Sequence, residues 1–275
     1  MKNIKLLKQI LSIPTFSGEE DRLVEFLKSY LKQKSIPFQM DDMGNILAKK
    51  GSSKHFPCVV AHTDSVHEIN TETIDIRDVK RYNSNRELKN ALSGYVPNTN
   101  QPTGCGGDDK AGVFICLQLL DYFDNIKVFF PVSEENGCAG TNAAPKEWFK
   151  DVGYFIQFDS PENNTMSETL RGRTLFFSDE EFWKLSKDII AEHGITKHQH
   201  HPFTDVGELK RRFEVECLNL AAGYYNYHTY NEYVVLEDVE NAVQLGKKLI
   251  ATLGCKKYKY ESKLFYIGHM FLKKG

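Results

Sequence analysis

The sequence has little net charge and no long apolar stretch. In its 275 residues, 35 Lys and Arg stand against 37 Asp and Glu, a formal net charge of −2. A balance this close to zero gives no reason to expect nucleic acid or an anionic membrane as a partner. The first residues have helical periodicity but no apolar core of the length that a signal peptide or a membrane span requires. We therefore expect a cytoplasmic protein without a membrane partner.

The cysteines also lack any recognisable pairing pattern. No C-x-x-C spacing occurs, and the six cysteines are scattered through apolar segments, which predicts reduced thiols rather than disulfides. Repeats, low-complexity tracts and Pro/Ser-rich linkers are missing as well. We expect one catalytic domain over residues 1–255, followed by a basic and aromatic tail, 256–275, that packs on the domain or extends it. The cysteines are Cys58, Cys105, Cys116, Cys138, Cys217 and Cys255.

What is present is an alternation of predicted strands and helices. Short apolar runs predict strands, and amphipathic stretches predict helices, the first of them opened by a capping box at residues 17–20. This alternation predicts an α/β fold: a single-domain, three-layer α/β/α arrangement with a mixed, mainly parallel central sheet. Strands are expected within 36–50 (two), 56–61, 126–132, 153–158 and 215–222. Helices are expected from residue 20, over 109–123, 139–150 (broken), 178–193, from 204–205, and over 236–253.

Carboxylates and a histidine follow several of these strands. His62 follows the strand 56–61, Glu134 and Glu135 follow 126–132, and Asp159 follows 153–158. Asp108 opens the next helix after a glycine-rich loop. Ligands in such sheets bind beyond the carboxyl ends of the strands, so we expect these groups to converge at one edge.

His62 and Asp64 are two residues apart on an extended segment and share a face. A metal-bound imidazole commonly donates its second N–H to a carboxylate, so His62 is a candidate ligand and Asp64 its orienting partner. A surface histidine beside a turn-capping aspartate would give the same spacing. Asp108 and Asp109 follow Gly-Cys-Gly-Gly, where the backbone can approach closely enough for a carboxylate to bridge two cations. An ordinary N-cap is the alternative at that position.

The neighbours Glu134 and Glu135 point in different directions and can divide into a base and a metal ligand. A water between two divalent cations is acidified, and a nearby carboxylate can pass its proton to a leaving amine. Asp159 ends a buried strand, where an ionised carboxylate is costly unless a cation pairs with it. His228 lies in a loop too aromatic to be only a solvated turn.

Two further groups are ambiguous. The run His198-Gln-His-His201 can bind metal but has no further ligand pattern, so surface or supporting histidines are the simpler interpretation. Arg171 and Arg173 could hold a substrate carboxylate bidentately, but surface ion pairs are the interpretation that we favour.

Together these motifs resemble, in the same order, those of the co-catalytic zinc exopeptidases, the family of peptidase T and the single-domain zinc aminopeptidases. The resemblance extends from about residue 5 to 253. It implies that His62 and Asp159 hold one zinc, that Glu135 and His228 hold the other, and that Asp108 bridges them. It also implies that Glu134 is the general base, that Asp64 orients His62, and that the bond between Asp108 and Asp109 is cis. The motifs are Ala61-His-Thr-Asp64, Gly107-Asp-Asp-Lys-Ala-Gly112, Ser133-Glu-Glu-Asn-Gly137, Phe158-Asp159 and Tyr227-His-Thr-Tyr-Asn-Glu232.

One departure from the peptidase T pattern concerns a lid domain that those enzymes insert after the position matching Asp159. Residues 160–199 are too few for such a domain, so we expect none. The polar segment 77–107 reads as a long loop that could fold over the site instead.

Three functions fit these expectations. The first is a metal-dependent aminopeptidase that hydrolyses short peptides with two divalent ions, zinc by resemblance. The second keeps the metals but acts as an amide deacylase or a carboxypeptidase-like hydrolase. The third is a non-catalytic binding protein on the same fold, although a retained Glu134 speaks against it.

Overall fold

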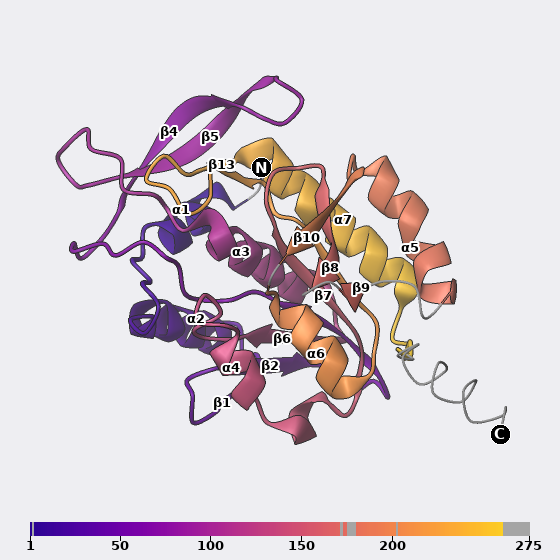
Figure 1. The fold of residues 1–275 in the computed structure, drawn as a ribbon. Coiled ribbons are helices and arrows are strands. Elements are labelled where there is room, and N and C mark those ends of the chain that lie inside the picture. Colours follow the sequence, from indigo (N-terminus) through magenta and orange to yellow (C-terminus); the bar gives the residue numbers. More distant parts are fainter. Residues whose placement is uncertain (2, 171–172, 175–179, 202, 261–275) are drawn as a thin grey trace, which may run out of the picture.

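The computed structural model describes residues 1, 3–170, 173–174, 180–201 and 203–260, and it has three layers (Figure 1). A nine-stranded sheet forms the middle layer in the order β1-β2-β6-β3-β7-β11-β8-β10, with β9 paired to β8. Its central strands, β6, β3, β7 and β11, are parallel to one another. The strands are β1 (Phe38–Met40), β2 (Ile46–Lys50), β3 (Phe56–Val60), β6 (Ile126–Phe130), β7 (Val152–Ser160), β8 (Thr165–Leu170), β9 (Arg173–Thr174), β10 (Lys197–His201) and β11 (Cys217–Ala221).

Helices cover both faces of this sheet. Alternate residues of β3 belong to different cores: Val59 packs with the larger helical layer, and Cys58 and Val60 pack with the smaller one. This alternation follows from the two-residue period of a strand. The larger layer contains α1 (Ile4–Leu11), α2 (Asp21–Gln33), α3 (Gly107–Tyr122), α5 (Glu180–Glu192) and α7 (Leu236–Leu253). The smaller layer contains α4 (Ala139–Ala143), the 3₁₀ helix η1 (Lys146–Phe149) and α6 (Asp205–Phe213). The predicted three-layer α/β/α fold with a mixed, mainly parallel sheet is confirmed.

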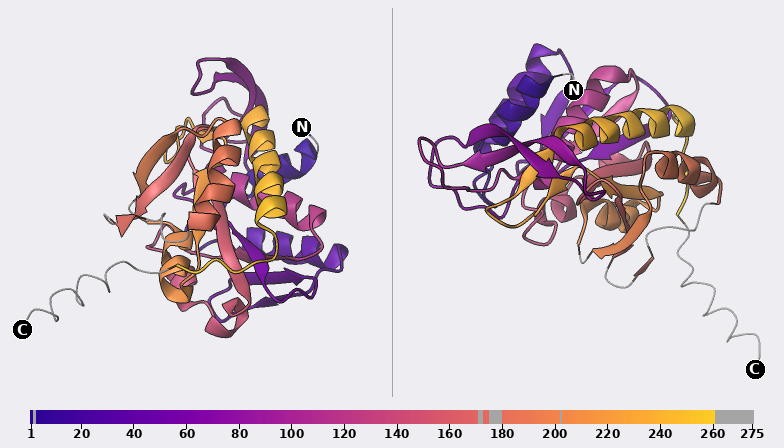
Figure 2. Two further views of the ribbon diagram at one scale, coloured as in Figure 1. Left: turned by 90° about the vertical axis from the view of Figure 1, so that its right-hand side faces the viewer. Right: turned by 90° about the horizontal axis from the view of Figure 1, so that it is seen from above.

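The prediction of a long loop over residues 77–107 is wrong. Most of this segment forms the hairpin of β4 (Asp75–Tyr82) and β5 (Leu88–Tyr95), which pairs with β13 (Tyr233–Val235) and β12 (Tyr224–Tyr225) in a second, four-stranded sheet. The hairpin projects from the body of the molecule (Figures 1 and 2). The outer strand of the hairpin, β4, has no buried residue. Its sequence therefore lacks the run of apolar residues that predicts a buried strand. Strand pairing, rather than burial of both faces, determines its structure.

The predicted capping box at residues 17–20 is also wrong. Helix α2 begins at Asp21, and neither Ser17 nor Glu20 makes a side-chain cap for it. The Ser17 hydroxyl donates instead to Oδ2 of Asp64 at 2.7 Å. Oε1 of Glu20 accepts a hydrogen bond from the backbone N–H of Ser133 at 3.0 Å. Both side chains therefore tie the N-terminal segment to loops at the carboxyl edge of the sheet.

The described residues between 160 and 215 form strands and helices that belong to the three-layer body of the molecule. Strands β8, β9 and β10 extend the central sheet, and α5 and α6 pack on its two faces. At the C-terminal end, Tyr258 is buried against Tyr154 and Phe182. All six cysteines are free, and only Cys255 is exposed. Among the described helices, none has the length and apolar composition needed to cross a bilayer.

Candidate metal centre

The residues singled out in the sequence meet at the carboxyl edge of the central strands. His62 lies just after β3, Glu135 lies in the turn after β6, and Asp159 is near the end of β7. Asp108 is in the first turn of α3, and His228 lies in the turn between β12 and β13. Five segments that are distant in sequence thus contribute to one site.

Asp108 lies between the two histidines. Its Oδ1 is 3.1 Å from Nε2 of His62, and its Oδ2 is 3.2 Å from Nε2 of His228. The peptide bond between Asp108 and Asp109 is cis, as the family resemblance implied. One carboxylate therefore faces an imidazole with each of its oxygens, which is the arrangement that a ligand bridging two cations requires.

Each histidine also has a second carboxylate partner. Oδ1 of Asp159 is 3.6 Å from Nε2 of His62, and Oε1 of Glu135 is 3.0 Å from Nε2 of His228. Among the described residues, three overlapping groups could each hold a metal ion, and within each group the ligand atoms lie within 4.8 Å of one another. These groups are His62 with Asp109 and Asp159, His62 with Glu134 and Glu135, and Asp108 with Glu135 and His228.

The buried carboxylate of Asp64 holds three parts of the site together. It lies 3.2 Å from Nδ1 of His62 and accepts the Ser17 hydroxyl. The backbone N–H groups of Glu134 and Glu135 donate to its two oxygens at 2.9 and 3.1 Å. Nδ1 of His62 is also 3.1 Å from the backbone carbonyl oxygen of Asp64, so this residue contacts the imidazole through both its carboxylate and its main chain. Asp64 therefore positions the two glutamates as well as the imidazole.

The histidines hold their protons strongly because carboxylates surround them. Hydrogen bonds to Asp108 and Glu135 raise the pKa of His228 to about 10. Burial opposes protonation of His62, but its hydrogen bonds to Asp108, Asp159 and Asp64 raise its pKa well above the usual value. In the metal-free chain, both imidazoles thus act as counter-ions for the carboxylates.

The carboxylates of the site titrate in opposite directions. Burial, together with the neighbouring Asp108, raises the pKa of Asp159 to about 8. Burial also raises the pKa of Glu134 well above its usual value, and nearby Asp205 and Asp159 add to this effect. For Asp108, burial acts in the same direction, but hydrogen bonds from both histidines lower its pKa. The site gathers more carboxyl groups than its two imidazoles can neutralise. Some of these carboxyl groups are therefore protonated in the metal-free chain.

The chemistry of these side chains fits divalent cations. Imidazole nitrogens and carboxylate oxygens are the ligands that zinc takes in hydrolytic sites. Oδ2 of Asp109 is buried and lacks a hydrogen-bond partner, and burial raises the pKa of this carboxyl well above its usual value. Cations would supply the charge that such a set of buried acids otherwise lacks.

The roles of the histidines in 198–201 and of the two arginines were left open by the sequence. His198 lies on the edge strand β10, with Nδ1 3.8 Å from Oε1 of Glu168. Burial lowers the pKa of His201, whereas the negative charge of Asp108 opposes this shift. Arg171 lies outside the described residues, as does the side chain of Arg173.

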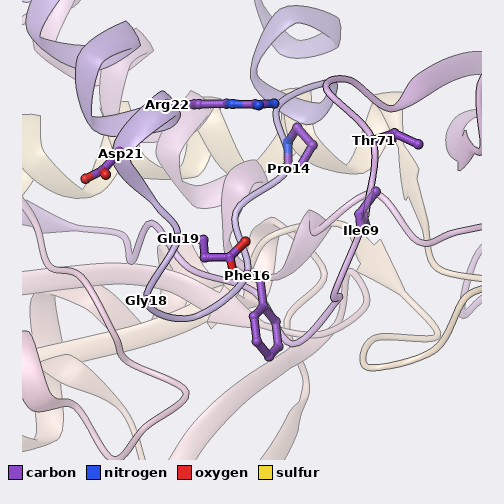
Figure 3. A pocket seen from close by; sticks show the side chains of 8 residues that line it. All are labelled: Pro14, Phe16, Gly18, Glu19, Asp21, Arg22, Ile69 and Thr71. Carbon is purple, nitrogen blue, oxygen red and sulfur yellow. The ribbon is translucent and has the colours of Figure 1, made fainter.

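A pocket of about 290 Å³ lies between residues 14–22 and residues 69–71 (Figure 3). The bridge between Phe16 and Ser65 joins the two segments that flank it. None of the seven residues predicted for the metal centre lines this pocket. It is lined by Pro14, Phe16, Gly18, Glu19, Asp21, Arg22, Ile69 and Thr71.

Comparison with known structures relates the fold of this chain to that of peptidases. No family model matches the sequence. Aminopeptidase PepT from Bacillus cereus superimposes with a TM-score of 0.72 at 13% identity, covering 91% of this chain and 97% of that one. A tripeptidase from Staphylococcus aureus superimposes with a TM-score of 0.68 at 12% identity, covering 90% and 96%. The chain has the co-catalytic zinc exopeptidase fold.

Matches to curated sequences are partial. A [LysW]-lysine hydrolase from Deinococcus radiodurans is 32% identical over 62 residues, which are 22% of this chain and 17% of that protein. The cytosol non-specific dipeptidase of Escherichia coli is 25% identical over 169 residues, 57% of this chain and 33% of that protein. The chain thus matches a third or less of the length of either relative, and the exopeptidase fold rests on the structural likeness.

Sequence reasoning missed several buried residues that support the site. Glu232 is buried and accepts hydrogen bonds from the backbone N–H groups of Cys105 and Asp108. At Asp205 the sequence predicts only the start of a helix, but the structure shows a buried carboxyl whose pKa is raised by burial to about 6. Gln157 lies two residues before Asp159, within a segment for which the sequence predicts only a strand. An interrupted apolar run, Tyr154-Phe-Ile-Gln157-Phe158, was the available signal for this last residue.

Proposed function

We propose that the chain is a two-metal exopeptidase that removes the N-terminal residue of short peptides. The observation that carries this proposal is the position of Asp108, whose two carboxylate oxygens face His62 and His228 at 3.1 and 3.2 Å. The shared fold of an aminopeptidase and a tripeptidase supports the same class of reaction.

By this proposal, His62 and Asp159 would hold one zinc ion, Glu135 and His228 would hold the second, and Asp108 would bridge them. Two such ions acidify a bound water and polarise the carbonyl of the scissile bond. Asp64 holds the ring of His62 and, through two backbone N–H groups, the turn of the glutamates.

Glu134 is the proposed general base. Its carboxylate belongs to a group with His62 and Glu135 in which each residue offers an atom within 4.8 Å of the others. It is buried, so a proton that it accepts is shielded from bulk water. Glu134 would take the proton of the attacking water and return it to the leaving amine.

The acidic character of the site supports a substrate with a free amino terminus, because an ammonium group is attracted to clustered carboxylates. We further propose a single catalytic domain, residues 1–255, without an inserted lid. The free cysteines support a reducing, cytoplasmic setting.

An amide deacylase is the second candidate, favoured by the partial match to a [LysW]-lysine hydrolase. Hydrolysis of matched dipeptides with free and acetylated N-termini separates the two after verified zinc loading. The aminopeptidase proposal expects cleavage of the free peptide and loss of cleavage on acetylation. Equal or faster cleavage of the acetylated peptide would establish the deacylase. Hydrolysis of neither by a zinc-loaded chain would favour a binding protein.

A further inference from the structure

A connected set of buried polar side chains lies behind Asp159. Gln157 precedes Asp159 by two residues on β7, so the two side chains share a face of the sheet. Nε2 of Gln157 is 3.2 Å from Oδ2 of Asp159 and 3.2 Å from Oδ2 of Asp205. Both N–H groups of one amide therefore have a carboxylate acceptor, and Gln157 and Asp205 are fully buried.

The orientation of this amide is determined by its other end. Oε1 of Gln157 accepts a hydrogen bond from the hydroxyl of Thr204 at 3.0 Å and from the backbone N–H of Val206 at 3.1 Å. A backbone N–H can only donate, so the atom facing Val206 must be the oxygen. The nitrogen is consequently the atom that faces the two carboxylates.

Further hydrogen bonds fix the partners of Gln157. Oδ1 of Asn219 accepts from the backbone N–H of Asp159 at 3.0 Å, and Nδ2 of Asn219 donates to Oγ1 of Thr204 at 3.1 Å. Oδ1 of Asp205 accepts from the hydroxyl of Thr141 at 2.5 Å. The network thus links β7, β11, α4 and the beginning of α6.

We infer that Gln157 is a positioning residue that holds Asp159 with Oδ1 directed toward His62. Oδ2 of Asp159 is engaged by the amide, while Oδ1 is the oxygen 3.6 Å from Nε2 of His62. A neutral amide suits this role because it donates without adding positive charge. A lysine in its place would compete with a cation for the carboxylate. Asp205 and Thr204 keep the amide in this orientation.

This role rests on the proposed function, because Asp159 acts as a ligand only if the site binds metal. The test is a zinc titration of the metal-free full-length chain against a chromophoric chelator. For wild type we expect two binding steps. For Gln157→Leu we expect one step to weaken about 10- to 100-fold, the usual effect of removing a partner of a metal ligand. The other step should be unchanged, because Glu135 and His228 are outside the network.

A matched control is available on the same strand. Tyr154→Phe removes the hydrogen bond from a tyrosine hydroxyl to the carbonyl of Gly254 at 3.1 Å, near the opposite end of β7. Both zinc affinities should remain at wild-type values in this variant. Circular dichroism establishes folding before each titration.

If Gln157→Leu does not fold, Gln157→Met replaces it with the same expectation. Methionine is similar in length to glutamine, but it has no N–H donor for Asp159. Absence of zinc binding by wild type would overturn the proposed function, and the role of Gln157 with it. Two wild-type steps that are unchanged in a folded Gln157 variant, or that weaken equally, would overturn the role of Gln157 alone.

Discussion

The carboxylate of Glu232 accepts a hydrogen bond from the backbone N–H of Asp108 at 3.1 Å. Its other oxygen accepts the backbone N–H of Cys105 at 3.0 Å and lies 3.2 Å from Nε2 of His67. A single buried side chain thus accepts hydrogen bonds from two backbone N–H groups of the glycine-rich segment that carries Asp108. The backbone N–H of Gly104 donates to the carbonyl of Tyr230, which anchors the same segment.

Glu232→Gln should therefore destabilise the protein. The new amide nitrogen would face backbone donors, leaving a buried group unsatisfied at a cost of about 1 to 3 kcal/mol. Urea denaturation measures the free energy of unfolding. Glu237→Gln is the control, because Glu237 is exposed and its substitution should cost less than about 0.5 kcal/mol. Equal stability of the two variants would show that the loop does not depend on Glu232.

The adjacent glutamates should respond differently to the same substitution. Glu134→Gln should retain zinc and fold while hydrolysis falls on the order of a hundred- to ten-thousand-fold, as expected for a lost general base. Glu135→Gln should weaken zinc retention, because an amide oxygen is a poorer ligand than a carboxylate. Zinc content and peptide turnover are measured on both variants. Full activity of Glu134→Gln would rule out the mechanism.

Removal of metal should lower thermal stability. The site residues repel one another without cations, and a ligand that binds only the folded state stabilises it by mass action. We expect the melting temperature to fall in chelator and to recover when zinc is added. At free zinc of about 100 times the dissociation constant, the stabilisation is roughly 2.7 kcal/mol. An unchanged melting temperature after verified metal removal would argue against a metal site.

The metal-free chain should also lose stability as the pH rises from 6 to 9. The pKa of Asp159 is about 8 when folded, and that of His228 is about 10. Both exceed their unfolded values of about 3.9 and 6.5, so the folded chain binds more protons. The contribution of Asp159 is full below about pH 4 and is lost as pH approaches 8. The contribution of His228 is full below about pH 6.5 and is lost toward pH 10.

Melting curves in chelator across this range test the sign. Asp159→Asn should give a shallower slope than wild type, because the substituted amide does not titrate. A melting temperature that rises with pH in chelator would contradict these shifts. With zinc bound, the slope should also be smaller, since metal displaces protons from its ligands.

Strong local signals made much of the fold predictable. Apolar runs such as Phe56–Val60 form strands in the centre of the sheet. Every residue of this strand is buried, so a continuous apolar sequence matches its surroundings. The clustering of His62 and Asp159 followed from the rule that parallel strands end at one edge. The outer strand β4, by contrast, lies half in solvent and carries alternating charges, so its sequence resembles a loop.

Other residues could not be predicted because their side chains bond to segments that are distant in sequence. Ser17 and Glu20 have the spacing of a capping box, yet each bonds to a loop distant in sequence. Gln157 interrupts an apolar strand, and three of its four hydrogen-bond partners, Thr204, Asp205 and Val206, come from a segment almost 50 residues away. Such roles depend on pairings that no local window contains.

The dispersal of the site along the chain has a consequence for biosynthesis. His62 emerges early from the ribosome, whereas His228 follows only after most of the sheet has been made. A nascent chain therefore carries several of the acidic side chains before its second imidazole exists. The complete site exists only when the β12–β13 turn, which carries His228, has joined the folded body. If the site binds two metal ions as proposed, the second ion can be held only after that step.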